Sequence, residues 1–174
     1  MIDPYTRGLV NVAYPHYQTH QGNTYAAQVS DESLSATDTL KMLMITADST
    51  DWVHLVWGLN VTGEATIQFL EAVTVSAEGT AVTAFNRNRN SANTPGMTVK
   101  KNPTVTDNGT QLISLYCGTT GLHINESQIS QNECEWILKP DSKYVLALTA
   151  HGDLKARIFC EWSERAYRGL EGWQ

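Results

Sequence analysis

Hydrophobic and polar residues alternate in short runs along most of the chain. The clearest run is residues 51–60, in which Val53, Leu55, Trp57 and Leu59 fall on one side at a period of two. This period is typical of a β-strand with one buried face. Further strand-like runs occupy positions 23–30, 40–47, 64–72, 80–86, 97–105, 111–117, 134–139, 143–150 and 155–162. Together they predict roughly eight to ten strands and no strong amphipathic helix.

Turn-forming residues separate these runs. The segment 107–109 (Asp-Asn-Gly) carries the strongest hairpin signal in the chain. The segment 140–142 (Pro-Asp-Ser) is typical of a turn between antiparallel strands. Pro103 interrupts the run that precedes the first of these turns and favours an edge position for it. The polar stretches 86–96 and 118–132 are predicted to be long loops.

These elements predict an all-β fold, an antiparallel β-sandwich. With eight main strands, a jelly roll is the leading topology, and an immunoglobulin-like sandwich fits the same pattern. The 174 residues suit a single domain. We expect an irregular N-terminal arm over residues 1–22, the sandwich over residues 23–163 and a short C-terminal tail over residues 164–174.

The N-terminal arm is unusually apolar for a chain end. It contains two prolines and no sustained periodicity, but it is rich in aliphatic and tyrosine side chains. Such a terminus is expected to lie against a surface. That surface could belong to its own domain, to a sister subunit or to another protein.

Charge and hydropathy exclude several classes of partner. The formal net charge is −6 and the sequence pI is near 5.3, which argues against nucleic-acid binding and against adsorption to anionic membranes. No run approaches the length of a membrane-spanning helix. The N-terminus does not have the pattern of a secretory signal peptide, so we expect synthesis in the cytoplasm.

The pattern of the three cysteines also favours synthesis in a reducing cytoplasm. Cys117, Cys134 and Cys160 are odd in number, far apart and without a C-x-x-C pair, so a structural zinc site is not expected. All three lie in strand-like runs, where a reduced buried thiol is the favoured interpretation. One disulfide with a free thiol is the alternative.

No catalytic or cofactor motif stands out. The sequence lacks a G-x-S-x-G elbow, an H-E-x-x-H helix and a phosphate-binding loop, and its carboxylates are scattered at turns and strand ends. His16 and His20 are four residues apart, the spacing of a metal-binding pair on a helix. Pro15 and the low helix propensity around it predict that no helix forms there. We therefore expect no enzyme, no cofactor and no metal site.

Exposed aromatic and basic residues are the candidate binding groups. Trp57, Trp136 and Trp162 alternate with apolar neighbours and are expected in the core. Trp52 lies off that face, where it could stack on a sugar, contact a protein or cover the rim of the domain. A local basic cluster follows from Arg87 and Arg89 in the Asn-rich loop with Lys100 and Lys101 after it. It could contact an acidic protein surface or be a solvated loop.

Three segments together resemble a known family. They are PYTRGLVNVAYPHYQTHQG, then WVHLVWGLNVTGEATIQFLEAVTVSAEGTAVTAFNRNRNS, then EWILKPDSKYVLALTA followed by a strand ending in IFCEW. Their order and spacing resemble small structural proteins of tailed bacteriophages, with the patterns "EAPTVSAxGT…NRNS" and "LKPxTxYLLxxT". The resemblance spans nearly the whole chain, and only the tail after Trp162 extends beyond it.

The resemblance implies a head decoration or cement protein on the capsid exterior of a virion. Its expected partners are the major capsid protein and further copies of itself, as a homodimer or homotrimer. Candidate contact residues are Tyr5, Arg7, Tyr14, His16 and Tyr17 of the arm, followed by Arg87 and Arg89. The alternative is a tail- or vertex-associated receptor or carbohydrate-binding module, with Trp52 as the stacking residue.

Overall fold

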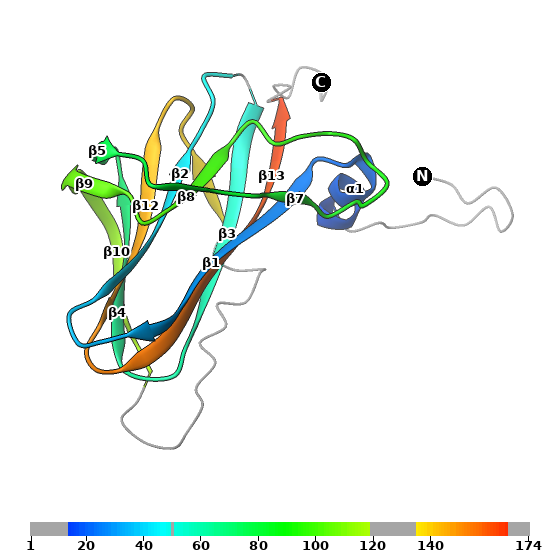
Figure 1. The fold of residues 1–174 in the computed structure, drawn as a ribbon. Coiled ribbons are helices and arrows are strands. Elements are labelled where there is room, and N and C mark those ends of the chain that lie inside the picture. The colour runs from blue at the N-terminus through cyan, green and yellow to red at the C-terminus, as the bar shows by residue number, and fades with distance from the viewer. Residues whose placement is uncertain (1–13, 50, 119–134, 167–174) are drawn as a thin grey trace, which may run out of the picture.

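The computed structural model describes residues 14–49, 51–118 and 135–166, which form a β-sandwich with one short helix (Figure 1). The elements are α1 (Tyr14–Gln21), β1 (Thr24–Leu34), β2 (Thr39–Ile45), β3 (Asp51–Val61), β4 (Ala65–Glu71), β5 (Thr74–Ala77), β6 (Thr80–Val82), β7 (Phe85–Asn86), β8 (Thr98–Lys101), β9 (Thr104–Asp107), β10 (Thr110–Cys117), β11 (Trp136–Leu138), β12 (Lys143–Ala150) and β13 (Leu154–Ala166). Among these residues no helix has the length and apolar character needed to cross a membrane.

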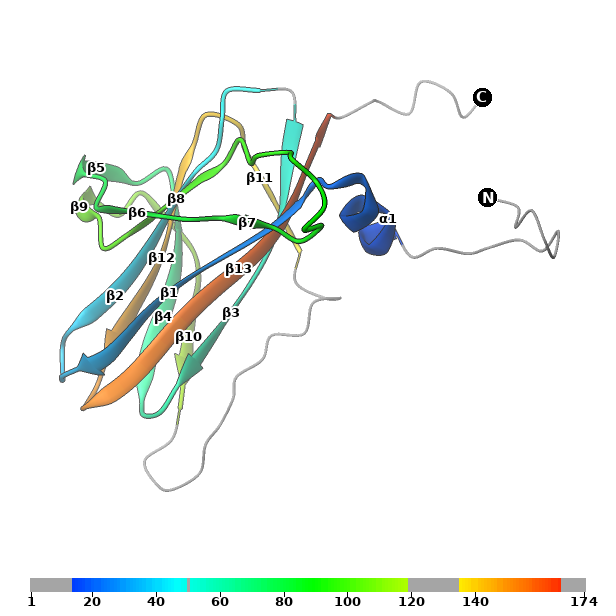
Figure 2. The ribbon, with the colours of Figure 1, turned by 45° about the vertical axis from the view of Figure 1, so that its right-hand side comes forward.

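Two antiparallel sheets face each other, and their strand order is that of a jelly roll (Figure 2). One sheet has the order β11-β3-β13-β1-β7 and the other β10-β4-β12-β2-β8-β6. The eight strands of the jelly roll in chain order are β1, β2, β3, β4, β10, β11, β12 and β13. β1, β13, β3 and β11, which are the first, eighth, third and sixth of these strands, share one sheet. β2, β12, β4 and β10, which are the second, seventh, fourth and fifth, share the other. The predicted sandwich and its jelly-roll topology are confirmed, and the immunoglobulin-like alternative is wrong.

A folded ribbon is inserted between β4 and β10. The chain from β4 to β6 runs antiparallel to the chain from β8 to β10, through the pairs β4–β10, β5–β9 and β6–β8. The ribbon leaves one edge of the six-stranded sheet at β10 and β4 and returns to its opposite edge, where β8 pairs with β2. It ends at β7, which pairs with β1 in the other sheet. The ribbon therefore ties both sheets together at one end of the sandwich.

Two kinks allow this ribbon to fold. At each kink a glycine on one strand faces a residue with positive φ on the other: Gly109 (+59°) faces Ala72 (+59°), and Gly79 (+83°) faces Asn102 (+52°). A Cβ on Gly109 would lie 2.2 Å from the Glu71 carbonyl oxygen, so only glycine fits the conformation and the close approach. The ribbon changes direction where these residues interrupt the ladder.

The predicted hairpin at residues 107–109 is wrong for the same reason. A type I′ hairpin turn needs positive φ at both central residues, and Asn108 does not have it. The strand before this segment pairs with β5 and the strand after it pairs with β4. The segment 140–142 does form a turn, but it joins β11 and β12, which belong to opposite sheets.

Two clusters of apolar side chains stabilise the sandwich. The larger lies between the sheets and contains an aromatic group in which Phe69 packs against Trp57, Trp136 and Tyr144, with ring centroids 5.2–6.1 Å apart. Trp57 and Trp162 are buried and Trp136 is partly buried, so the predicted core positions are confirmed. The smaller cluster lies where the ribbon strands β5 and β9 pack on the outer face of the six-stranded sheet. It comprises Leu43, Leu70, Val73, Val145 and Ala147.

Cys117 and Cys160 are free thiols buried in the sandwich. Burial raises the pKa of the Cys160 thiol to about 12 and also raises that of Cys117, so both stay protonated at neutral pH. Their reduced state agrees with the expectation from the sequence. Cys134 lies outside the described residues.

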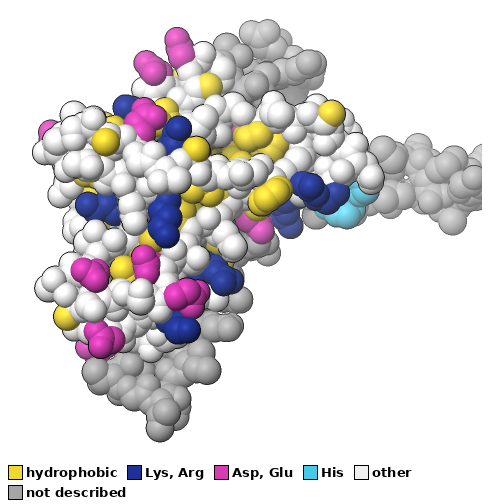
Figure 3. All heavy atoms as spheres, viewed as in Figure 1, with side chains coloured by type: hydrophobic (Ala, Val, Ile, Leu, Met, Phe, Trp, Pro, Cys, Tyr) yellow, Lys and Arg dark blue, Asp and Glu magenta, His cyan; other side chains and the backbone are white. Residues whose placement is uncertain are grey.

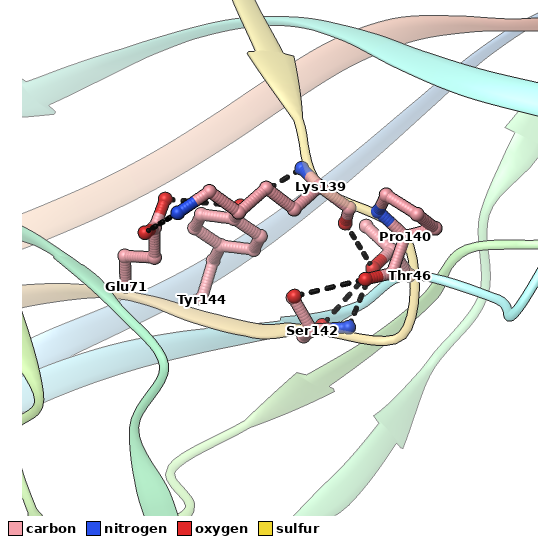
Figure 4. Close-up of polar contacts among 6 residues, drawn as sticks. All are labelled: Thr46, Glu71, Lys139, Pro140, Ser142 and Tyr144. Atoms are coloured by element: carbon pink, nitrogen blue, oxygen red, sulfur yellow. Dashed lines mark hydrogen bonds and ion pairs between the residues drawn. The ribbon is translucent and has the colours of Figure 1, made fainter.

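A polar cluster fixes the link between β11 and β12 (Figure 4). The buried Tyr144 hydroxyl accepts a hydrogen bond from the Lys139 backbone N–H at 2.9 Å and donates one to the Glu71 carboxylate at 3.2 Å. The Lys139 ammonium group lies 2.6 Å from the same carboxylate. The Thr46 hydroxyl accepts from the Ser142 N–H at 2.9 Å and lies 2.7 Å from the Lys139 carbonyl oxygen. The end of β11 and the turn after it are thereby attached to the six-stranded sheet.

Tyr144 is expected to make folding stability sensitive to high pH. Burial, with a contribution from the charge of Glu71, raises the pKa of its phenol above 10.0. Between pH 10 and that higher pKa the folded chain keeps a proton that the unfolded chain loses, so the free energy of unfolding falls as pH rises. In Tyr144→Phe, stability near pH 7 is expected to drop by about 1–2 kcal/mol because the Lys139 N–H loses its acceptor.

Urea denaturation at pH 7 and above pH 10 measures both effects. The further loss of stability above pH 10 should be smaller in Tyr144→Phe than in the wild type. An equal loss in both proteins would contradict this role for Tyr144.

The helix α1 overturns the prediction that residues 14–21 are not helical. Pro15 falls in the first turn, where the backbone N–H has no partner in the helix, so the proline costs nothing there. At the other end Gly22 has φ +74° and its N–H donates to the Thr19 carbonyl at 3.0 Å, as in a helix C-cap. The expected irregular arm thus ends in a helix, and its residues 1–13 lie outside the described part of the chain.

The boundary of the C-terminal tail is also shifted. β13 continues through Ala166, which pairs with Asp51 of β3, so the first three residues of the expected tail belong to the sandwich. Residues 167–174 lie outside the described chain.

Candidate protein-interaction site

The structure brings two of the predicted contact regions together. α1 carries His16 and Tyr17 on its exposed side, and the loop between β7 and β8 carries Arg87 and Arg89. Tyr14 begins α1. The remaining two candidates of the arm, Tyr5 and Arg7, lie outside the described residues.

Asparagine side chains attach the loop to the helix. The buried Asn86 amide donates to the Gly22 carbonyl at 2.8 Å, and the Asn88 amide donates to the His20 carbonyl at 3.0 Å. The Asn93 amide also donates to Gly22, at 3.3 Å. These bonds satisfy carbonyl groups that end a helix without an internal partner. The helix and the Asn-rich loop therefore form one structural unit.

The close packing of this unit depends on Gly22. A Cβ there would lie 2.2 Å from the Ser91 hydroxyl oxygen, and the positive φ disfavours any other residue. The unit sits at the start of β1, where Asn23 accepts a hydrogen bond from the Glu164 N–H at 3.1 Å. α1 is thus joined to the end of the five-stranded sheet.

The two arginines of the loop border an exposed aromatic side chain. Phe85 of β7 is 56% exposed, and the Arg89 guanidinium carbon lies 5.5 Å from its ring centroid. Arg87 forms an ion pair with Glu161 of β13 at 2.7 Å. The expected basic cluster is smaller than the sequence indicated. Lys100 and Lys101 lie on β8, where one is 3.8 Å from Glu78 and the other donates to the Ser30 carbonyl at 2.6 Å.

A shallow hollow of about 560 Å³ lies beside Phe85 on the outer face of the five-stranded sheet. Its lining includes Ala26, Gln28, Thr83, Phe85, Phe159 and Glu161. The Phe159 ring lies over Gly58, where a Cβ would come within 2.5 Å of the ring. Across the strands Val56 pairs with Glu161, Glu161 with Ala26, and Ala26 with Phe85. The hollow is therefore an apolar strip, bordered by the ion pair between Arg87 and Glu161.

Figure 3 shows the resulting surface. Hydrophobic side chains gather near β7, and basic and histidine side chains follow toward α1. An apolar centre with a charged border is the usual composition of a protein–protein interface, in which aromatic residues and arginine are enriched. We call the surface formed by α1, Phe85, the loop 87–97 and the hollow the α1–β7 surface.

Trp52 lies on the outer face of the same sheet, near the start of β3, and is 36% exposed. Its predicted exposure is confirmed. The hollow beside Phe85 is lined by other residues, so Trp52 is not part of the α1–β7 surface.

Sequence reasoning missed Phe85 as a surface residue. It placed residues 80–86 in a single strand, but the chain forms β6 in one sheet and β7 in the other. The sequence did contain a signal for this exposure, because side chains alternate between the two faces of a strand. Val82, Ala84 and Asn86 point inward, and Phe85 falls on the opposite face with Ala81 and Thr83. The alternation alone therefore turns Phe85 outward.

Glu164 was also missed, and it anchors the other end of the loop. Its carboxylate accepts hydrogen bonds from the backbone N–H groups of Gly96 at 2.7 Å and Met97 at 2.9 Å, and from the indole N–H of Trp162 at 2.7 Å. Glu164→Ala is expected to lower the free energy of unfolding by about 2–3 kcal/mol, because three donors lose a charged acceptor. The amides of Gly96 and Met97 should then exchange hydrogen faster.

Chemical denaturation and hydrogen exchange measure these effects. The matched control is Glu32→Ala, which removes an exposed ion pair with Lys155 at 3.2 Å and is expected to change stability by less than about 0.5 kcal/mol. Unchanged exchange at Met97 in Glu164→Ala would contradict the anchoring role.

The described residues hold no cluster of three or more His, Cys, Asp or Glu side chains that could bind a metal ion. The α1–β7 surface presents an exposed ring, two guanidinium groups and a shallow apolar strip. No protein-family model, curated protein or solved structure matches the chain.

Proposed function

We propose that the chain is a non-enzymatic structural protein of a tailed bacteriophage that binds the outer surface of the capsid. It stabilises the contacts between neighbouring major capsid subunits. The sequence resemblance to phage decoration proteins suggests this role, and the α1–β7 surface supports it. The chain is made in the bacterial cytoplasm and acts in the assembled virion.

The observation that carries the proposal is the exposed Phe85 between the hollow and the two arginines. Binding energy at protein interfaces concentrates in a few aromatic and arginine residues surrounded by contacts that exclude water. Phe85 has the required exposure, and Arg89 stacks against it. This surface lies at one end of the sandwich and includes α1, which directly follows the arm residues 1–13 in the chain (Figure 1).

Cementing of a capsid follows from mass action. A protein that binds the assembled shell and not its separated subunits stabilises the shell by RT ln(1 + [L]/Kd) at each site. At a free concentration of about 100 Kd this amounts to about 2.7 kcal/mol per site. A lattice repeats this gain at every site, so modest affinity is sufficient.

Binding to capsids that lack the protein tests the proposal. The purified chain is mixed with such capsids, sedimented and quantified, and the temperature at which the shells release their DNA is measured. Saturable binding together with a higher release temperature is the expected result. No sedimentation with capsids would overturn the proposal.

Self-association belongs to the same proposal. We expect a homodimer or homotrimer, because symmetric oligomers match the repeated subunit contacts of a capsid surface. Sedimentation velocity of the purified chain measures its oligomeric state directly, and a monomer at micromolar concentration would contradict this part.

A second candidate function is a receptor- or carbohydrate-binding module at the tail or a vertex. The exposure of Trp52 on the outer sheet face favours it, because indole rings stack on sugars. Glycan-array binding that is lost in Trp52→Ala would support this function over the capsid-binding one.

A further inference from the structure

The exposed side of α1 carries a histidine pair whose metal-binding chemistry the proposed function does not need. His16 and His20 lie one helical turn apart, and their Nε2 atoms are 3.0 Å from each other. The ring centroids are 4.5 Å apart and the planes meet at 79°. Both residues are exposed, so the pair lies at the surface where an ion from solvent can reach it.

This separation matches the bite of a chelated metal ion. Imidazole nitrogens coordinate zinc at about 2.0–2.1 Å, so two adjacent ligands lie about 2.9–3.4 Å apart. Without metal, one neutral ring donates a hydrogen bond to the other across the same distance. A metal ion bound by both Nε2 atoms would take the place of this hydrogen bond while the two nitrogens keep about the same separation.

The pair is held in place by contacts beyond the helix. An isolated helix of eight residues is marginal in water. Here the Asn88 side chain donates to the carbonyl of His20 at 3.0 Å, and the N–H of Asn23 donates to the carbonyl of Gln18 at 3.2 Å. These bonds fix the last turn and with it the spacing of the two rings. A site organised in advance loses less free energy on binding.

We propose that His16 and His20 form a bidentate site for a divalent transition-metal ion of the Zn²⁺, Ni²⁺ or Cu²⁺ class, which prefer imidazole ligands. No further His, Cys, Asp or Glu of the described chain joins the pair in a cluster of three. The remaining coordination positions are filled by water or by donors of another molecule, such as the same pair from a second copy. The proposal does not depend on capsid binding.

Calorimetric titration of the full chain with Zn²⁺, repeated with Ni²⁺, tests the site at about pH 7.5, where imidazole is mostly neutral. The expected result is one ion per chain or per two chains. The affinity should fall tenfold or more in His16→Gln and in His20→Gln. His151→Gln serves as the matched control, because this exposed histidine contacts Thr66 at 2.7 Å and should leave the affinity unchanged.

A spacing control separates geometry from histidine count. The double variant Tyr17→His, His20→Gln keeps two histidines on α1 but sets them about 100° apart around the helix axis. It should bind as weakly as the variant with both His16→Gln and His20→Gln. Circular dichroism confirms that each variant is folded. If the wild type binds no tighter than the variant lacking both histidines, the proposal is wrong.

Discussion

Gly109→Ala is expected to lower the free energy of unfolding by about 2–4 kcal/mol. Gly109 has φ +59°, and a Cβ there would lie 2.2 Å from the Glu71 carbonyl oxygen. An alanine must therefore accept left-handed strain and push the facing strand away at the kink. This kink lies between the β4–β10 pair and the β5–β9 pair, so the substitution should weaken the hydrogen bonding of both pairs.

Chemical denaturation of Gly109→Ala beside Gly152→Ala measures the effect. Gly152 has no positive φ, and a Cβ added there would have no other atom within 4 Å, so its replacement should change stability by less than about 0.5 kcal/mol. Similar stabilities for the two variants would show that the kink at Gly109 does not need its glycine.

Phe85→Asp is expected to weaken capsid binding by about 100-fold or more without unfolding the protein. The substitution replaces the apolar centre of the α1–β7 surface with a charge and removes the ring on which Arg89 stacks. Because Phe85 is 56% exposed, its loss should leave the stability of the sandwich nearly unchanged. The capsid sedimentation assay measures the affinity, and thermal denaturation checks the fold.

The matched control for Phe85 is Tyr116→Asp. Tyr116 is 90% exposed and lies on β10 in the opposite sheet, away from the α1–β7 surface. The same change from aromatic to carboxylate there should leave capsid binding intact. Equal losses in both variants would mean that added charge weakens binding, and Phe85 would have no special role.

The long strands were predictable because their buried faces repeat at a local period. β3 and β13 each place every second residue in the core, and this pattern is visible in the sequence alone. The eight-stranded sandwich follows from such runs and the turns between them. β12 was also recognised as a strand from the sequence. Nearly all of its side chains are buried, because the ribbon covers its outer face at Val145 and Ala147.

The ribbon and the helix were not predictable because distant residues create them. The kink at Gly109 needs Ala72 on the facing strand, and nothing in the segment 107–109 indicates that partner. α1 has weak intrinsic propensity, and the asparagine side chains that cap it come from a loop more than sixty residues later. The sequence marked the kink by its Asp-Asn-Gly segment and the helix by the spacing of His16 and His20. The conformation that each segment adopts depends on tertiary contacts.

The candidate site was predicted in part. The arm and the Arg87–Arg89 loop were selected separately, one for its apolar character and the other for its charge. The structure joins the helix at the end of the arm to this loop through Asn86, Asn88 and Gly22. Phe85, which lies beside Arg89, was assigned to an unbroken strand. Its outward orientation follows from the local alternation, but its place in the other sheet, beside the Arg87–Arg89 loop, depends on the change of sheet between β6 and β7, which the local pattern does not reveal.

The most direct test of the capsid-binding role is the copy number of the chain per virion. Quantitative mass spectrometry of purified particles, with the major capsid protein as the internal reference, measures it. A decoration protein is expected in hundreds of copies, in a simple ratio to the capsid subunit. A few to a few dozen copies would contradict capsid decoration and place the chain at the tail or a vertex.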